Sequence, residues 1–184
     1  MTPDDANPTD GIDSLTNPET FTELDGVQIS DEVQVVSEAE FERRDTWDGV
    51  AVIGVTDENG DLLLAKFADG HGWMLPNGPV EPGDDYVAAA THWAEVMTGV
   101  SVTVDDIDRI RRRHYQTEDG RETIGHHVIF QGSPVEGTAV AENPGLPQQD
   151  IETVGWFAHP PADADWDHEN FGKDVRRFLG EAEE

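Results

Sequence analysis

A turn rich in glycine and proline at positions 75–84 carries residues whose types and spacing suit chemistry. Its acidic members, Glu81 and Asp84, precede an apolar stretch that predicts a helix ending at Thr98-Gly99. Carboxylates near a helix start could bind a hard divalent cation or serve as a catalytic base. We therefore take Glu81 and Asp84 as candidate catalytic residues. Glu152, which follows a predicted long loop, is a further candidate because its carboxylate could approach this turn.

A second group of candidates is basic. Arginines at 109, 111, 112 and 113 fall in a predicted strand, and alternation places Arg111 and Arg113 on one face with Tyr115. Arginine suits bidentate phosphate binding, so Arg111 and Arg113 are candidate ligand-binding residues. The alternative is a basic face that neutralises neighbouring acids. The pair His126-His127 points to opposite faces and predicts no local metal site.

The elements that must position these residues follow from local patterns. Short strands are expected near 27–29 and 33–36. Ser37 is expected to cap a short helix that runs through Glu40, with Phe41 on its apolar side. Residues 50–55 and 62–67 flank an Asn-Gly turn and predict a hairpin. A second hairpin is expected from 107–115 and 123–131. A strand at 101–104, a long loop at 132–149, a strand at 151–157 and a final amphipathic helix at 171–179 complete the prediction.

The composition restricts the partners and the compartment. Asp and Glu total 40 against 11 Lys and Arg, for a formal net charge of -29, which opposes binding to nucleic acid or an anionic membrane. Either the acids lie in disordered tails or the whole surface is acidic. Their spread favours a halophilic protein in concentrated salt, where the Debye length is about 3 Å. There are no cysteines, no long apolar run and no basic signal-peptide start, so a cytoplasmic location is expected.

The layout of residues 78–100 resembles the box of the Nudix hydrolase family, Gly-x5-Glu-x7-Arg-Glu-apolar-x-Glu-Glu-x-Gly-apolar. Gly78 takes the first glycine, Asp84 the first glutamate and His92 the arginine, and Gly99-Val100 match the end. The wider resemblance covers about residues 48–179. It implies a nucleoside diphosphate derivative as substrate and Mg²⁺ or Mn²⁺ as cofactor, with metal ligands on the box helix.

The acidic centre of this box is replaced. Trp93, Val96 and Met97 stand where the resemblance implies metal-binding glutamates, and none suits a hard cation. Glu95 points to another side of the helix. These apolar residues are expected to pack on core, loop or a partner, with base stacking on Trp93 as the alternative. The remaining candidates for a rearranged metal site are Gly78, Glu81 and Asp84.

The sequence thus predicts an α/β (α+β) protein, a Nudix-like sandwich of a mixed β-sheet between helices. Residues 1–24 are expected to form an acidic disordered extension and 25–184 the Nudix-like domain. We expect a protein with a degenerate box that binds a nucleotide or diphosphate-type ligand, or a protein partner, without ordinary hydrolysis. The alternative is a divergent hydrolase that uses Mg²⁺ or Mn²⁺. Candidate ligand contacts are Gly78, Trp93, Arg111 and Arg113, and homodimer formation stays open.

Overall fold

The computed structural model describes residues 15, 18, 27–67, 72–135, 137, 151–161 and 170–179. The element order is β1 (Gln28–Val35), α1 (Glu38–Asp45), β2 (Gly49–Val55), β3 (Leu62–Phe67), β4 (Gly72–Met74), β5 (Asn77–Val80), α2 (Tyr86–Thr98), β6 (Val102–Gln116), β7 (Glu122–Pro134), β8 (Ile151–Phe157) and α3 (Asn170–Phe178). Contacts group these elements into two compact units that interleave along the sequence, and each is described by itself. The mixed five-stranded sheet, the antiparallel three-stranded sheet and the three helices of the described residues confirm the predicted α/β class.

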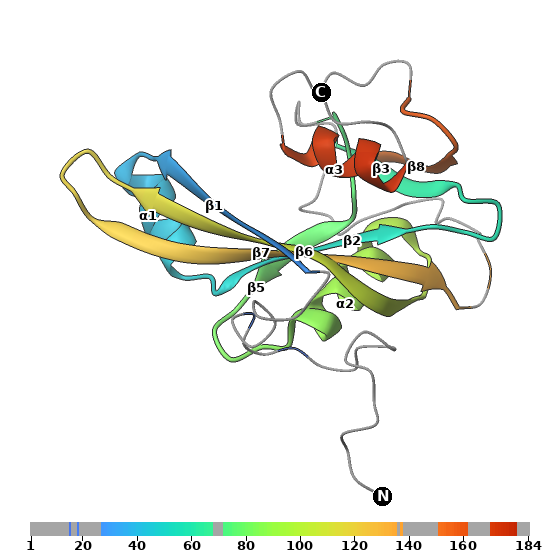
Figure 1. Ribbon diagram of the computed structural model, residues 1–184, viewed down its shortest axis with the longest axis horizontal. Helices are drawn as coiled ribbons and strands as arrows, with labels where there is room; N and C mark the ends of the chain where they lie inside the picture. Colours follow the sequence, from blue (N-terminus) through green and yellow to red (C-terminus); the bar gives the residue numbers. More distant parts are fainter. Residues whose placement is uncertain are drawn as a thin grey trace, which may run out of the picture. The chain divides into compact units, whose positions relative to one another are not determined.

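The larger sheet has the order β1-β6-β7-β2-β5. β1 runs parallel to β6, whereas β2 and β5 are antiparallel, so the sheet is mixed. Figure 1 shows β6 and β7 as its two longest strands, with β1 beside β6. The separate strands expected at 101–104 and 107–115 are one continuous strand, which runs through Asp105, which is exposed, and Asp106, which is half-buried.

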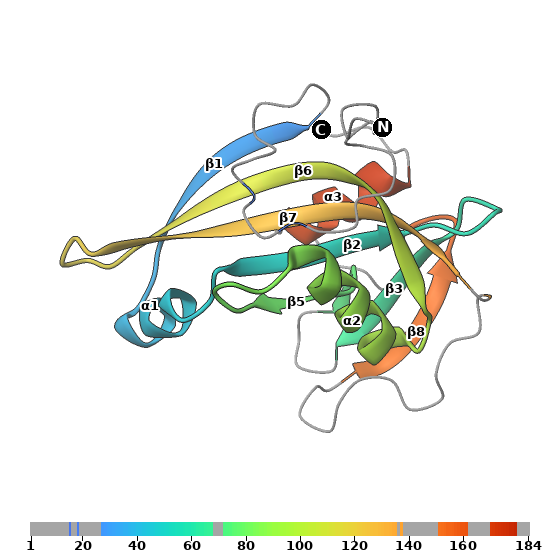
Figure 2. The same ribbon diagram turned by 90° about the horizontal axis from the view of Figure 1, so that it is seen from below.

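The segment before β2 forms a helix longer than predicted. Ser37 caps α1 by accepting a hydrogen bond from the backbone N–H of Glu40, as expected of an N-cap serine. Phe41 is buried with Val36 and Tyr115, so α1 lies against the Tyr115 face of β6 (Figure 2). The two short strands predicted before this helix are one strand, β1.

The hairpin predicted for residues 50–67 is wrong in its pairing. The turn forms, since Asp57 accepts hydrogen bonds from the N–H groups of Asn59 and Asp61. After one bridge between Thr56 and Leu62 the strands separate, and β3 instead joins the sheet β4-β3-β8. β2 and β3 are both almost fully buried. Their apolar sequences are therefore compatible with pairing to each other and equally with pairing to other strands.

Two predictions concern segments that are only partly described. Of the predicted extension 1–24, only Leu15 and Pro18 are described, and the expected loop 132–149 is described only at 132–135 and 137. The final helix is present as α3, and Val175 on it is fully buried. No helix in the described ranges has the length and apolar character needed to span a membrane.

Candidate functional site

The start of α2, the helix that carries the box residues, is held by hydrogen bonds at Asp85 and Tyr86. Asp85 accepts hydrogen bonds from the N–H groups of Val87 at 2.9 Å and of Leu15 at 2.8 Å, so it caps α2. The N–H of Tyr86 donates to the carbonyl of Leu15, and the Tyr86 hydroxyl donates to Asp48 at 2.6 Å. Burial, and then the hydrogen bond to Asp48, raise the pKa of Tyr86, so its proton stays in this bond. The first turn of α2 is therefore tied to Asp48, the residue before β2.

The turn before α2 brings two predicted catalytic residues together. The N–H of Asp84 donates to the carbonyl of Glu81 at 3.0 Å across Pro82-Gly83. Both acidic residues are exposed. At the other end, Gly99 takes a φ of +78° and donates to the carbonyl of Glu95, which ends the helix where the sequence predicted.

The three substituted box positions lie in different environments along α2. Met97 is fully buried, on the same helix face as Tyr86, Ala90 and Ala94, which are also fully buried. Trp93 and Val96 lie on the flank of that face and are half-buried, and Glu95 is exposed. The ring of His92 packs edge-on against Trp93, with centroids 5.1 Å apart. This face of α2 therefore supplies a core residue and a partly accessible apolar strip.

This donor set does not fit a magnesium or manganese ion. Hard divalent cations take oxygen ligands, and indole, isopropyl and thioether groups offer none that suits them. Within the described ranges, no three His, Cys, Asp or Glu side chains gather where they could hold a metal. Glu81 and Asp84 offer two carboxylates in one turn, so water or substrate phosphate would have to complete an octahedral shell there.

The predicted arginine strip pairs with acids of β1. Arg111 and Arg113 both lie near Glu32, with Nε to carboxylate distances of 3.6 and 3.3 Å. Arg112 on the opposite face pairs with Asp31 at 3.2 Å. The predicted alternation of faces is thus present, and the ion pairs agree with the neutralising interpretation. A phosphate group at Arg111 and Arg113 would have to compete with Glu32.

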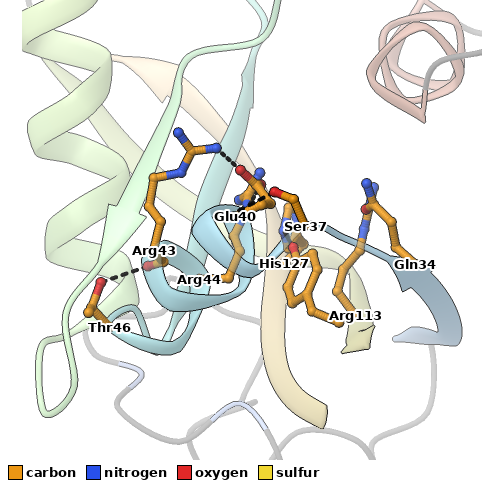
Figure 3. Close-up of polar contacts among 9 residues, drawn as sticks. Gln34, Ser37, Glu40, Arg43, Arg44, Thr46, Arg113 and His127 are labelled. Carbon is orange, nitrogen blue, oxygen red and sulfur yellow. Dashed lines mark hydrogen bonds and ion pairs between the residues drawn. The ribbon is translucent and has the colours of Figure 1, made fainter. Parts of the chain in front are cut away.

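Sequence reasoning missed the polar cluster that this arginine face forms with α1. The Tyr115 hydroxyl lies 3.2 Å from His127 Nε2, and the guanidinium of Arg44 lies 5.3 Å from the Tyr115 ring centre. Figure 3 shows α1 presenting Arg44 beside Arg113 and His127. The predicted grouping of Tyr115 with Arg111 and Arg113 was the available clue. Nothing in the sequence indicated that α1 would cover it.

Burial is the main reason that the pKa of His127 lies well below its usual value of 6.5, and nearby arginines lower it further. His127 is thus neutral when folded but takes up a proton when unfolded below about pH 6.5. Stability from this residue is fully present above that pH and is lost as pH falls toward the folded pKa. Between about pH 7 and pH 5.5, the melting temperature of wild type should therefore fall more steeply than that of His127→Gln. Parallel slopes in calorimetry would contradict this assignment.

The other candidates, Gly78 and Glu152, belong to different sheets. Gly78 is buried in β5 and pairs with Ala51 of β2, so it is a sheet residue. Glu152 of β8 forms an ion pair with Lys66 of β3 at 3.6 Å. Lys66 also lies 6.0 Å from the ring centre of Trp73, which packs edge-on against Phe157. Glu152 therefore lies on the surface of the three-stranded sheet, where it pairs with Lys66.

A mixed sheet, a Gly/Pro turn and a capped helix ending at Gly99 define a Nudix-type domain. Residues 45–179 match the sequence profile of the NUDIX domain, which covers well over half of the chain. The chain therefore belongs to the Nudix family. Members of this family generally use divalent metals such as Mg²⁺ or Mn²⁺. Among curated proteins no match is found.

Solved structures with a similar arrangement are Nudix proteins at low identity. A Nudix hydrolase from Nitrosomonas europaea has 16% identity and a TM-score of 0.48, over 72% of this chain and 71% of that one. An ADP-ribose pyrophosphatase from Streptococcus suis has 14% identity and a TM-score of 0.45, over 71% and 85%. A Nudix-family hydrolase from Clostridium perfringens has 10% identity and a TM-score of 0.49, over 72% and 96%. At these values the matches carry no argument about substrate.

Proposed function

We propose that this Nudix-domain protein binds a nucleotide or another diphosphate-type ligand, or a protein partner, without ordinary Nudix hydrolysis. The observation that carries the proposal is the box helix. Trp93, Val96 and Met97 stand at the family's metal-ligand positions, and Met97 is fully buried. A helix face of this kind supplies apolar contact area instead of carboxylate oxygens. The protein is expected to act in a salt-rich cytoplasm, which its acidic composition favours.

The ligand contacts that we test first are the arginines of β6, while the backbone near Gly78 and the indole of Trp93 stay candidates from the resemblance of the box. Guanidinium groups bind phosphate through paired N–H donors, and aromatic rings stack on bases. In this account Glu32 occupies the two arginines until an anionic group displaces it, since Arg111 and Arg113 share that one carboxylate. Glu32 should therefore weaken ligand binding.

A calorimetric titration in molar KCl, with ADP-ribose and pyrophosphate as the probes, tests this proposal. Arg113→Gln should weaken binding about tenfold through the loss of a charged hydrogen-bonding group, and Glu32→Gln should tighten it. Arg112→Gln is the matched control, because Arg112 lies on the opposite face of the same strand. Equal effects of the Arg112 and Arg113 substitutions, or no binding of either probe, would remove the ligand assignment.

The second candidate function is a divergent hydrolase with Mg²⁺ or Mn²⁺. The observation that favours it is the exposed pair Glu81 and Asp84, which the Pro82-Gly83 turn holds together. If these carboxylates act in catalysis, Glu81→Gln and Asp84→Asn should each abolish metal-dependent turnover while leaving thermal stability unchanged. Under our first proposal there is no such turnover to abolish.

A further inference from the structure

Large apolar side chains are exposed mainly at one place in the described part of the chain. Val33 is 63% exposed, Val35 64% and Ile124 46%, and all three belong to the sheet formed by β1, β6 and β7. A fourth, Val135, is 59% exposed and follows β7. Single exposed apolar residues are ordinary, but a group of them on one sheet is a candidate contact surface when other features support it.

The three residues share one face of the sheet. In the β1–β6 register Val33 lies beside His114, and Val35 lies beside Gln116. His114 and Gln116 both reach Glu122 of β7, at 3.6 and 2.6 Å. Ile124 is two residues beyond Glu122, so it points to the same side. We call this surface the Val33 face: Val33, Val35 and Ile124 with the polar groups between them.

The opposite face of these strands is already covered. Tyr115 alternates with His114 and Gln116 along β6, and it packs with Phe41 of α1. The guanidinium of Arg121 also lies over the Phe41 ring, 4.9 Å from its centre. The helix thus occupies one side, and the exposed valines lie on the other.

Charges on the Val33 face are balanced, unlike those of the chain as a whole. Asp31 pairs with Arg112 at 3.2 Å and with His114 at 3.0 Å, and His114 also faces Glu122. The hydrogen bond to Asp31 raises the pKa of His114, and Glu122 acts in the same direction, which favours the charged imidazole. Two acids therefore meet two bases on this face, whereas the whole chain has a formal net charge of -29.

We propose that the Val33 face is the surface through which two copies of this chain associate. A two-fold arrangement sets the same patch against itself, so acids of one copy can lie beside bases of the other around the apolar side chains. Elsewhere two such acidic molecules repel each other. A nucleic acid or an anionic membrane would meet the same repulsion from the surrounding charge.

The charge distribution also fixes how association responds to salt. Concentrated KCl screens the long-range repulsion between two acidic chains, whereas apolar contacts carry no charge for it to screen. Self-association through the Val33 face should therefore increase with KCl. An interface held mainly by surface ion pairs would weaken under the same change.

Sedimentation equilibrium of the full chain in molar KCl tests this proposal. The mass should rise with concentration from the 20.2 kDa of one chain toward twice that value. Val33→Glu and Val35→Glu should each weaken self-association about tenfold or more, because each places an acid in an apolar contact. Val135→Glu is the matched control, an equally exposed valine outside the Val33 face, and it should leave association unchanged. Unchanged melting temperatures establish that the variants fold.

Three results would overturn the proposal. The first is a wild-type chain that stays monomeric at every concentration. The second is a dimer that Val33→Glu and Val35→Glu leave intact, since another surface must then hold it. The third is a loss of association in Val135→Glu as large as in the other two variants. The proposal does not depend on ligand binding or hydrolysis, so the earlier experiments can fail without affecting it.

Discussion

Gly49→Ala is expected to lower the free energy of unfolding by about 3 kcal/mol, because the site has no room for a methyl group. A Cβ at Gly49 would lie 2.0 Å from the carbonyl oxygen of His126 and 2.4 Å from the Tyr86 hydroxyl. The first is backbone of β7, which cannot move alone. The second donates to Asp48, so the substitution would also disturb the contact that ties α2 to the residue before β2. Calorimetric melting in molar KCl measures the loss.

Gly125→Ala serves as the control for this prediction. A Cβ there would approach only the ring of Tyr115, at 3.3 Å, and a side chain can shift by a few tenths of an ångström. Its expected cost is about 1 kcal/mol or less. A Gly49→Ala protein that melts at the wild-type temperature would mean that β2, β7 and Tyr86 are not packed as described.

Met97→Glu is expected to destabilise the protein by roughly 3–5 kcal/mol, since it buries a carboxylate in place of a core side chain. Met97 is fully buried on the same face as Tyr86 and Ala94. Restoring the family's residue at this position should therefore damage the fold instead of completing a metal site. Adding Mg²⁺ should not recover the lost stability, because a single buried carboxylate cannot provide the oxygen shell that the ion needs.

Val96→Glu is the comparison for Met97→Glu. Val96 is half-buried on the flank of the same helix, so its carboxylate can reach water and the expected cost is about 1 kcal/mol or less. Equal costs for the two substitutions would show that the box positions share one environment. A Met97→Glu variant that is stabilised by Mg²⁺ would show that an oxygen-rich site still lies beside this helix.

Much of the helix that bears the box could be predicted because its determinants are local. Glycine and proline set the turn before α2, and Gly99 ends it where the pattern placed the stop. The capping role of Ser37 was likewise a matter of three neighbouring residues. The NUDIX profile match confirms the family that these features indicated.

Long-range pairing could not be obtained in the same way. The apolar runs of β2 and β3 fit a hairpin as well as they fit two different sheets, and only packing decides between these. The capping contact of Asp85 with Leu15 joins residues 70 positions apart, so no local pattern indicates it.

The sequence predicted which residue types make up the candidate site, but it did not predict which partners they contact. Alternation gave the faces of Arg111, Arg112 and Arg113, but the shared partner Glu32 depends on the parallel register of β1 with β6. The low pKa of His127 depends on burial and on nearby arginines, including Arg44 of α1. A sequence carries neither the register nor the burial directly.

The central claim is that the chain keeps the Nudix scaffold without ordinary Nudix hydrolysis. Initial rates with ADP-ribose, dinucleoside polyphosphates and nucleoside triphosphates, each with Mg²⁺ or Mn²⁺ in molar KCl, test it most directly. Our account predicts that product formation matches the protein-free control for every pair of substrate and metal. Metal-dependent turnover that Asp84→Asn or Glu81→Gln abolishes, in a protein that still melts at the wild-type temperature, would contradict it.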